Sequence, residues 1–328
     1  MKNATDGWSG KKVLLTGGLG FIGSALARKL VSLGSDVTLV DSLIPEYGGN
    51  LENIRDLIGR VRVNISDVRD RHSLRYLVSG TDVLFNLAGQ TSHQDSMDNP
   101  YTDLEINCSA QLSILETCRH YCPTVKIVFA STRQIYGKPD YLPVDENHLL
   151  RPTDVNGINK MAGEHYHILY NNVYGLRSCA LRLTNTYGPG MRIKDARQTF
   201  LGIWIRMALE NRPISVWGGT QLRDFNFVDD VVDALLLAAS TDETNGHFYN
   251  LGSPEVLTLQ SLAEKLIAIC GGQYEVLPFP SERKKIDIGD YYADFSKFAA
   301  LGWNPVVDLA AGLERTVEYY RKHLSQYL

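Results

Sequence analysis

A glycine-rich turn near the N-terminus constrains the fold of this chain more than any other feature of the sequence. The segment Val13–Gly23 reads VLLTGGLGFIG: Gly18, Gly20 and Gly23 fit the pattern G-x-G-x-x-G, and Gly17 begins the shifted pattern G-x-x-G-x-x-G. An apolar run precedes the turn and an amphipathic helical pattern comes after it, as in a dinucleotide-binding βαβ unit. Glycines let the backbone approach a pyrophosphate, whose charge meets free N–H groups and the positive end of the helix. The segment therefore predicts a dinucleotide site, the alternative being a tight turn that binds nothing.

Short apolar runs alternate with helical patterns through the first half of the chain. The predicted strands are Lys12–Thr16, Asp36–Asp41, Val61–Ile65, Asp82–Ala88 and Val125–Ala130. Their nearly continuous apolar character is typical of parallel strands that are covered on both faces. Asn99–His120, with Pro100 near its start, predicts a long helix. This alternation predicts an α/β fold with a doubly wound parallel sheet of the Rossmann type.

The pattern changes after about residue 182, where prolines divide the chain into shorter elements. These prolines are Pro189, Pro213, Pro254, Pro278, Pro280 and Pro305. We expect a dinucleotide-binding domain over residues 1–182, with a returning segment near 225–252. A smaller C-terminal domain over residues 183–328 is expected to bind mainly the substrate.

Composition and charge argue against several classes of partner. The formal net charge of −4 provides no electrostatic case for binding nucleic acid or an anionic membrane. No apolar run reaches the roughly 18 residues that a membrane span needs, and residues 1–10 lack the apolar core of a secretory signal. The five cysteines form no metal-ligand cluster. We therefore expect a cytoplasmic protein without a metal site and without a nucleic-acid or membrane partner.

Acidic residues at the ends of predicted strands specify the dinucleotide further. Asp41 stands 18 residues after Gly23, where its carboxylate can accept hydrogen bonds from both hydroxyls of an adenosine ribose. Its charge would repel a 2′-phosphate, and Ser42–Tyr47 contains no Arg or Lys to offset that repulsion. These features favour NAD over NADP. Asp67, directly before Val68, is placed to bond the adenine amino group, the alternative being a solvated loop carboxylate.

Several segments resemble the extended short-chain dehydrogenase/reductase family, specifically its nucleotide-sugar epimerases and dehydratases. They are NLAGQ (86–90), STRQIYG (131–137), NKMAGE (159–164), LTNTYGP (183–189), RDFNFVD (223–229) and LGWNP (301–305). They occur in the family's order, and the likeness runs from about Lys12 to the C-terminus. It implies NAD as the cofactor and a nucleotide sugar as the substrate. It also implies a homodimer, paired through the helix near residues 99–120 and the helix that comes after Lys160.

The resemblance completes the expected cofactor site. It implies that Lys160 holds the nicotinamide ribose and that Asn107 supports the site through water. The segment Leu87–Gly89 ends in small residues, which would let the cofactor lie close to the backbone. The residues expected to bind NAD are Gly17, Gly20, Phe21, Ile22, Gly23, Asp41, Asp67, Val68, Leu87, Ala88, Gly89, Asn107 and Lys160.

The resemblance also implies how the substrate is held. Thr132 matches the residue that hydrogen-bonds the reacting sugar hydroxyl, and Asn185 matches a contact to the sugar-nucleotide diphosphate. Arg223 and Arg283 fall where relatives clamp that diphosphate, a task that suits guanidinium groups because they combine charge with geometry. For either arginine, a surface ion pair is the alternative.

The chain departs from the family pattern at one catalytic position. Asn156 stands four residues before Lys160, where relatives carry a tyrosine that removes the proton. An amide cannot act as a general base. The expected catalytic residues are therefore Thr132, Asn156 and Lys160, with the base unassigned.

Three explanations for the missing tyrosine stay open. In the first, another group takes the proton, either directly or through a water beside Asn156; Asp154, His93 and Tyr141 are the candidates in the sequence. In the second, the chemistry needs no alcohol oxidation. In the third, the protein binds a nucleotide sugar without converting it.

The residues after Thr132 bear on the type of reaction. Relatives that are 4,6-dehydratases usually carry Asp-Glu there, whereas this chain has Arg133 and Gln134, which cannot shuttle a proton near neutral pH. Arg133 would suit an anionic sugar substituent such as a carboxylate, the alternative being a salt bridge. The expected substrate-binding residues are thus Arg133, Gln134, Asn185, Arg223 and Arg283.

These observations together predict an NAD-dependent nucleotide-sugar epimerase. In the relatives, a proton leaves a sugar hydroxyl while a hydride passes to NAD⁺, and return of the hydride to the opposite face inverts the carbon. The alternatives are a nucleotide-sugar dehydratase or lyase with a displaced base, and a non-catalytic protein that binds a nucleotide sugar or NAD.

Overall fold

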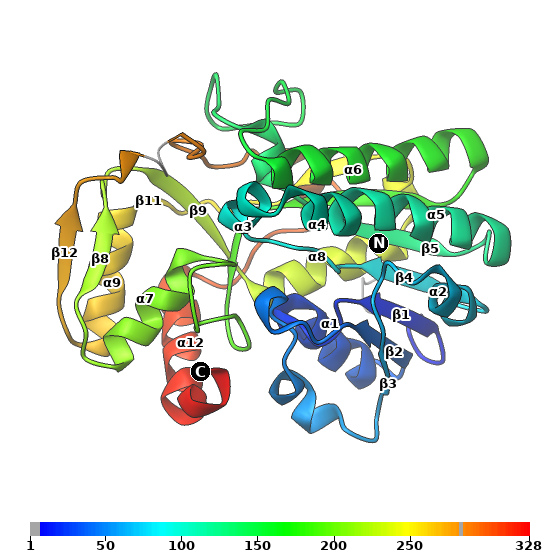
Figure 1. The fold of residues 1–328 in the computed structure, drawn as a ribbon, viewed down its shortest axis with the longest axis horizontal. Helices are drawn as coiled ribbons and strands as arrows, with labels where there is room; N and C mark the ends of the chain where they lie inside the picture. The colour runs from blue at the N-terminus through cyan, green and yellow to red at the C-terminus, as the bar shows by residue number, and fades with distance from the viewer. Residues whose placement is uncertain (1–6, 282–284) are drawn as a thin grey trace.

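A seven-stranded sheet forms the centre of the computed structural model, which describes residues 7–281 and 285–328 (Figure 1). The strand order is β10-β6-β5-β4-β1-β2-β3, and every neighbouring pair runs parallel. The strands are β1 (Lys12–Thr16), β2 (Asp36–Asp41), β3 (Arg62–Ile65), β4 (Val83–Asn86), β5 (Lys126–Thr132), β6 (Ser178–Leu183) and β10 (Phe248–Asn250). This order confirms the predicted doubly wound parallel sheet.

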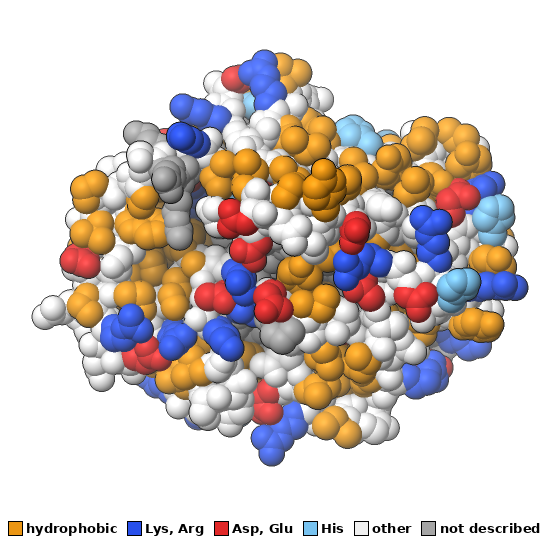
Figure 2. Space-filling view, in the orientation of Figure 1, with side chains coloured by type: hydrophobic (Ala, Val, Ile, Leu, Met, Phe, Trp, Pro, Cys, Tyr) orange, Lys and Arg blue, Asp and Glu red, His pale blue; other side chains and the backbone are white. Residues whose placement is uncertain are grey.

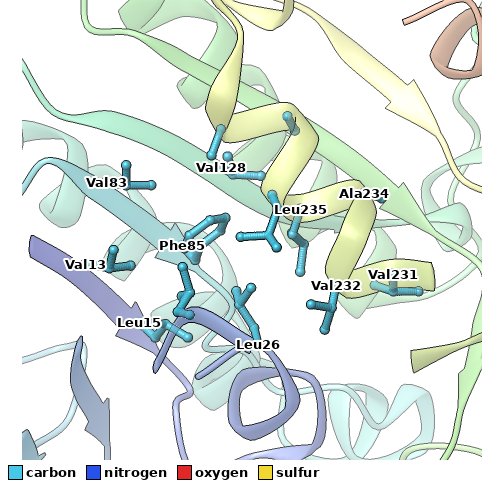
Figure 3. Close-up of a cluster of buried hydrophobic side chains, with 14 of the residues drawn as sticks. Val13, Leu15, Leu26, Val83, Phe85, Val128, Val231, Val232, Ala234 and Leu235 are labelled. Atoms are coloured by element: carbon cyan, nitrogen blue, oxygen red, sulfur yellow. The ribbon is translucent and has the colours of Figure 1, made fainter. Parts of the chain in front are cut away.

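Helices cover both faces of this sheet. One face carries α1 (Phe21–Ser32) and α8 (Val228–Ser240), and the other carries α2 (Arg71–Val78), α5 (Ala110–Tyr121) and α6 (Val155–Tyr174). Along β1, Val13 and Leu15 point into the first layer, where they pack near Phe85 and Leu235 (Figure 3). Leu14, between them, joins the opposite layer. Burial on both faces is the reason that the strands show continuous rather than alternating apolarity.

The predicted helix over Asn99–His120 is continuous but not uniform. It consists of α4 (Pro100–Leu104), a π-helical turn η3 (Glu105–Ser109) and α5. The widened turn leaves the carbonyl of Ile106 to accept a hydrogen bond from Gln111 Nε2 at 2.9 Å. Such π-turns occur often at functional sites. Here the turn contains Asn107, and its backbone packs closely against Gly163 of α6.

A second group of elements comes after β6 and builds its own apolar core around Trp204, Leu262 and Leu313. Its strands are β7 (Asn185–Tyr187), β8 (Ile214–Trp217), β9 (Leu222–Phe227), β11 (Val256–Thr258) and β12 (Tyr274–Leu277). Its helices are α7 (Phe200–Leu209), α9 (Leu259–Cys270) and α12 (Leu309–His323). In Figure 1 these elements stand to the left of the parallel sheet.

Short helices complete the fold. They are α3 (His93–Asp98), α11 (Ser296–Ala299), η1 (Pro45–Tyr47), η2 (Leu51–Leu57), η4 (Arg133–Tyr136), η5 (Asp242–Thr244) and η6 (Leu324–Tyr327). No helix within the described ranges is both long enough and apolar enough to cross a bilayer.

A buried ion pair anchors α6, the helix that carries Asn156 and Lys160. The Arg182 side chain on β6 is 1% exposed, and its Nε donates to Glu164 Oε2 at 3.0 Å. The guanidinium also lies 3.9 Å from the centre of the Phe248 ring on β10. Because Glu164 stands about one helical turn after Lys160, this pair fixes the height of Lys160 above the sheet.

We expect Glu164→Gln to lower the free energy of unfolding by about 3–5 kcal/mol, because the change leaves the buried Arg182 charge uncompensated. Denaturant unfolding monitored by circular dichroism measures this loss. Glu318→Gln is the control, since Glu318 and its partner Lys322 are exposed, and it should leave stability nearly unchanged. An equal effect of the two substitutions would contradict the anchoring role of the pair.

Candidate active site

A cleft of about 270 Å³ runs along the carboxyl ends of the parallel strands. The expected cofactor residues that line it are Gly17, Gly20, Phe21, Ile22, Gly23, Asp41, Asp67, Val68, Leu87, Ala88, Gly89 and Lys160. The expected catalytic and substrate residues that line it are Thr132, Arg133, Gln134, Asn156 and Asn185, again with Lys160. Parallel strands end at one edge of the sheet, so loops that are far apart in sequence meet there.

The glycine turn brings two backbone segments into contact. A Cβ on Gly23 would collide with the Gly17 carbonyl, and Gly17 has φ +69° and lies against the Ala88 backbone. The helix α1 begins just after Gly20 with no side-chain cap and no acidic residue in its first turn. Its first N–H groups and its positive end are therefore available to an anion such as a pyrophosphate.

Asp41 is held firmly at the end of β2. Its two carboxylate oxygens accept hydrogen bonds from the backbone N–H groups of Leu19 and Leu43, each at 3.0 Å. Burial raises the pKa of Asp41, and these backbone hydrogen bonds oppose the rise. The lone pairs that remain on each oxygen can accept bonds from ribose hydroxyls.

Asp67 lines the cleft as part of an ion pair. Its Oδ2 lies 2.7 Å from Arg69 Nη2, and Arg69 also reaches Glu105 at 2.8 Å. The hydrogen bond from Arg69 lowers the pKa of Asp67. The carboxylate therefore stays charged and can still accept a bond from an adenine amino group.

Lys160 reaches into the cleft from α6 beneath Gly89. Its Nζ donates to the Ala130 carbonyl at 3.1 Å and lies 4.9 Å from the centre of the Phe129 ring. A Cβ on Gly89 would lie 2.9 Å from both Lys160 Nζ and Asn107 Oδ1, so the two polar atoms converge where glycine leaves space. The Asn107 Oδ1 is buried and has no hydrogen-bond partner among the described residues. A lysine donor and a free amide acceptor suit the hydroxyls of a ribose.

Burial lowers the pKa of Lys160 to about 8, while the negative charge of Asp103 opposes the shift. Asp103 is itself fully buried on α4. Its carboxylate accepts hydrogen bonds from the side-chain amides of Asn107, Asn156 and Asn159 at 3.0, 3.1 and 2.8 Å. Three amide donors and one nearby cation thus compensate the buried charge.

Asn156 belongs to this network. Its Nδ2 donates to the Gln90 carbonyl at 2.8 Å as well as to Asp103, and its backbone N–H donates to Ser96 Oγ at 3.2 Å. The residue in the tyrosine's place therefore holds neighbouring segments together. Sequence reasoning missed Asp103, although an Asp and an Asn four residues apart, which lie on one face of a predicted helix, were a usable signal.

The residues after β5 form the substrate end of the cleft. Thr132 Oγ1 accepts a hydrogen bond from the Gln134 backbone at 3.2 Å, which leaves its hydroxyl hydrogen free to donate. Gln134 does not present its amide nitrogen to the cleft, because Nε2 donates to Asp154 at 2.8 Å. Arg133 Nη2 donates to Asn185 Oδ1 at 3.0 Å, whereas Nη1 is buried without a partner in the described part of the chain.

The two arginines expected to clamp a diphosphate are not both in the cleft. Arg223 is absent from its lining; it is buried and donates to the Leu222 and Gly289 carbonyls. Burial, together with repulsion from Arg133, lowers the pKa of Arg223 to about 10. Arg283 lies outside the described residues.

The three candidate bases are placed differently. Tyr141 donates to Asp145 at 2.7 Å and does not line the cleft. His93 does line it, and its Nδ1 lies 2.9 Å from Asp154 Oδ2. Within the described residues, no cluster of three or more His, Cys, Asp or Glu side chains could hold a metal ion.

Comparison with known proteins shows what this architecture resembles. The model of the NAD dependent epimerase/dehydratase family matches residues 13–252. The chain is 33% identical to "Putative UDP-glucose 4-epimerase" of Methanocaldococcus jannaschii, over 95% of this chain and 99% of that protein. It is 29% identical to UDP-glucuronic acid decarboxylase 1 of Xenopus tropicalis, over 96% of this chain and 73% of that protein. An epimerase structure from Methanothermobacter thermautotrophicus aligns with a TM-score of 0.92 at 25% identity, covering 99% of this chain and 96% of that one.

The environment of Lys160 predicts a pH-dependent affinity for NAD⁺. Below about pH 8 the ammonium is charged, and above it the group becomes neutral and donates weaker hydrogen bonds. We expect the dissociation constant for NAD⁺ to rise by about fivefold to tenfold as the pH increases past this value, as when a charged hydrogen bond becomes a neutral one. Calorimetric titration between pH 6.5 and 9.5 measures the change. The Lys160→Met variant should bind NAD⁺ weakly at every pH. If the affinity of this variant for NAD⁺ still fell at alkaline pH, Lys160 would not be the group whose titration weakens binding.

Proposed function

The chain belongs to the NAD-dependent epimerase/dehydratase family, and on that premise we propose that it is an NAD-dependent nucleotide-sugar epimerase that works through a transient keto-sugar. One observation carries the proposal. A single cleft joins the glycine turn and Asp41 to Thr132 and Lys160. A dinucleotide that extends from the turn thus ends beside residues suited to a sugar hydroxyl.

The residues of the cleft fit NAD. The glycine turn and the start of α1 would hold the pyrophosphate, and Asp41 would accept hydrogen bonds from the adenosine ribose. Lys160 and Asn107 would hold the second ribose from below Gly89. When bound, NAD⁺ accepts a hydride from the sugar carbon and later returns it, and return to the opposite face inverts that carbon.

The substrate end of the cleft supports a nucleotide sugar. Thr132 has a free hydroxyl hydrogen with which to orient the reacting sugar hydroxyl. The Nη1 of Arg133 has no hydrogen-bond partner among the residues that the structure describes, and burial lowers the pKa of Arg133. A buried guanidinium in this state gains most from an anion that enters the cleft, such as the diphosphate. Asn185, which accepts a bond from Arg133, would contact the same group.

We further infer a homodimer built on the faces of α4, α5 and α6. Figure 2 shows hydrophobic side chains gathered over this part of the surface. The exposed large hydrophobic residues on these helices are Tyr101, Leu104, Tyr121, Ile158, Leu169, Val173 and Tyr174. A contiguous apolar surface of this kind suits a second copy of the same chain.

Arg133 also favours a second candidate, a lyase that acts on a nucleotide sugar bearing a carboxylate. Its unpartnered Nη1 could bind a sugar carboxylate instead of the diphosphate. In such a sugar, the carbon β to the carboxylate carries a hydroxyl. Oxidation of this hydroxyl would produce a β-keto acid, which loses CO₂ readily. The two candidates share the oxidation step and differ in the fate of the keto-sugar.

The function is tested by incubating the protein and NAD⁺ with UDP-, dTDP-, GDP- and CDP-hexoses in D₂O. We expect an epimer without net consumption of NAD⁺, and a transient absorbance of the reduced cofactor. The inverted carbon should carry no deuterium, because its hydrogen returns from the cofactor rather than from solvent. NMR and absorbance spectroscopy provide the readouts.

Saturable binding without an epimer or a reduced cofactor would instead favour the non-catalytic protein. The variant Asn156→Tyr then tests whether position 156 decides if the protein is active. Gain of activity over an inert parent would show that turnover was lost with the tyrosine. Loss of an existing activity would show that Asn156 is adapted to its own chemistry.

The second candidate is tested by comparing the affinities for UDP-glucuronic acid and UDP-glucose. The lyase predicts tighter binding of the uronic acid by about tenfold to a hundredfold, the value of a charge-assisted hydrogen bond. Arg133→Gln should abolish this preference, while Arg315→Gln, which changes an exposed arginine, should preserve it. Equal affinities in the parent protein would exclude carboxylate recognition by Arg133.

A further inference from the structure

Transient oxidation requires a group that takes the proton of the sugar hydroxyl, and Asn156 cannot do so. We propose that His93, oriented by Asp154, is the catalytic base that takes over from the absent tyrosine. This inference rests on the proposed function, since it concerns the oxidation step of that reaction. Four features of the structure carry it.

The first feature is the direction of the imidazole. His93 opens α3 and lines the same cleft as Thr132 and Lys160. Its Nδ1 lies 2.9 Å from Asp154 Oδ2, and its side chain is 40% exposed whereas that of Asp154 is 0% exposed. The buried Nδ1 thus faces the carboxylate in an ion-pair contact that lacks the alignment of a hydrogen bond. The Nε2 has no hydrogen bond to any described residue and is the nitrogen left to face a ligand.

The second feature is the rigidity of Asp154. Its Oδ1 accepts the Gly157 N–H at 2.7 Å, which caps α6, and its Oδ2 accepts Gln134 Nε2 at 2.8 Å. Although burial opposes it, the adjacent His93 ring and the hydrogen bonds from Gly157 and Gln134 keep the pKa of Asp154 below its ordinary value. A charged, immobile carboxylate 2.9 Å from Nδ1 favours the imidazole tautomer with the proton on Nδ1, which leaves Nε2 as the acceptor.

The third feature is the connection to the substrate residue. Gln134 joins the two parts of the site, because its side chain donates to Asp154 and its backbone donates to Thr132 Oγ1. Gln134 thus links Asp154, the partner of His93, to Thr132, which would orient the sugar hydroxyl.

The fourth feature explains the asparagine. α3 packs against α6 (Figure 1), and Asn156 fastens this contact by donating to Ser96 Oγ and to the Gln90 carbonyl. Gln90 Nε2 in turn donates to the Ser92 carbonyl at 2.9 Å. Asn156 is therefore a positioning residue that holds the segment on which His93 stands.

The proposed step balances in protons and electrons. His93 Nε2 takes the proton of the hydroxyl O–H while the hydrogen on the same carbon leaves as a hydride to NAD⁺, and the C–O bond becomes C=O. His93 is then an imidazolium, stabilised by the Asp154 carboxylate. In the return step the carbonyl carbon regains the hydride on its other face, and the oxygen regains its proton from His93. Neither the protein nor the cofactor undergoes net oxidation.

The test compares His93→Gln with His72→Gln, a matched change of an exposed histidine on α2. Stopped-flow absorbance of the reduced cofactor measures oxidation in a single turnover with the hexose that the parent protein converts. We expect His93→Gln to slow this step by about 10²–10⁴-fold, the usual contribution of a general base. The dissociation constants for NAD⁺ and the nucleotide sugar should stay within about threefold of the parent values, and His72→Gln should keep the parent rate.

A rescue experiment separates chemistry from structure. We expect added imidazole to restore oxidation in His93→Ala in proportion to its concentration, because it supplies the missing acceptor. Asp154→Asn should slow the step with little change in binding. Two outcomes would overturn the assignment of His93 as the base while the proposed function stands. In the first, His93→Gln oxidises the sugar at the parent rate. In the second, imidazole does not restore oxidation in a His93→Ala variant that still binds NAD⁺ and the nucleotide sugar. Absence of oxidation in the parent protein would overturn both.

Discussion

A buried negative charge organises the centre of this site. Asp103 is fully enclosed, and its carboxylate is compensated by three asparagine amides and by the nearby ammonium of Lys160. Burying a carboxylate is costly unless its lone pairs are satisfied, so the surrounding side chains are tightly constrained. The network joins α4, the π-turn and α6 beside Lys160. Residues on these three elements thus depend on one another.

This constraint gives the unusual Asn156 a physical reason. A tyrosine at this position would offer a phenol but could not supply an amide N–H to Asp103 and to the Gln90 carbonyl at once. With asparagine, the α3 segment is tied to the start of α6, and His93 stands against Asp154. Under the proposed mechanism, Asn156 thus positions the segment that carries His93. The glycine turn and Asp41 follow β1 and β2 and take no part in this network.

Much of the framework could be predicted from local patterns. The continuous apolar runs predicted the first five strands closely, and the glycine turn predicted the dinucleotide fold that the sheet order confirms. The predicted family and its cofactor, NAD, are confirmed by the match over residues 13–252. The roles of individual site residues stay predictions. Arg223 illustrates this, since its guanidinium bonds backbone carbonyls and pairs with Asp287, and its role toward a substrate stays a prediction.

The sequence by itself determined the βαβ architecture, the position of the phosphate-binding turn, and the absence of a tyrosine four residues before Lys160. These features depend on residue type, spacing and periodicity along a short stretch of chain. Only the tertiary structure decided that His93 meets Asp154, that Asn156 serves Asp103, and that Arg133 keeps an unpartnered nitrogen. Each of these depends on contacts between segments that are separated by tens of residues. Hydrogen bonding between such segments is set by how the helices pack on the sheet, which no local pattern encodes.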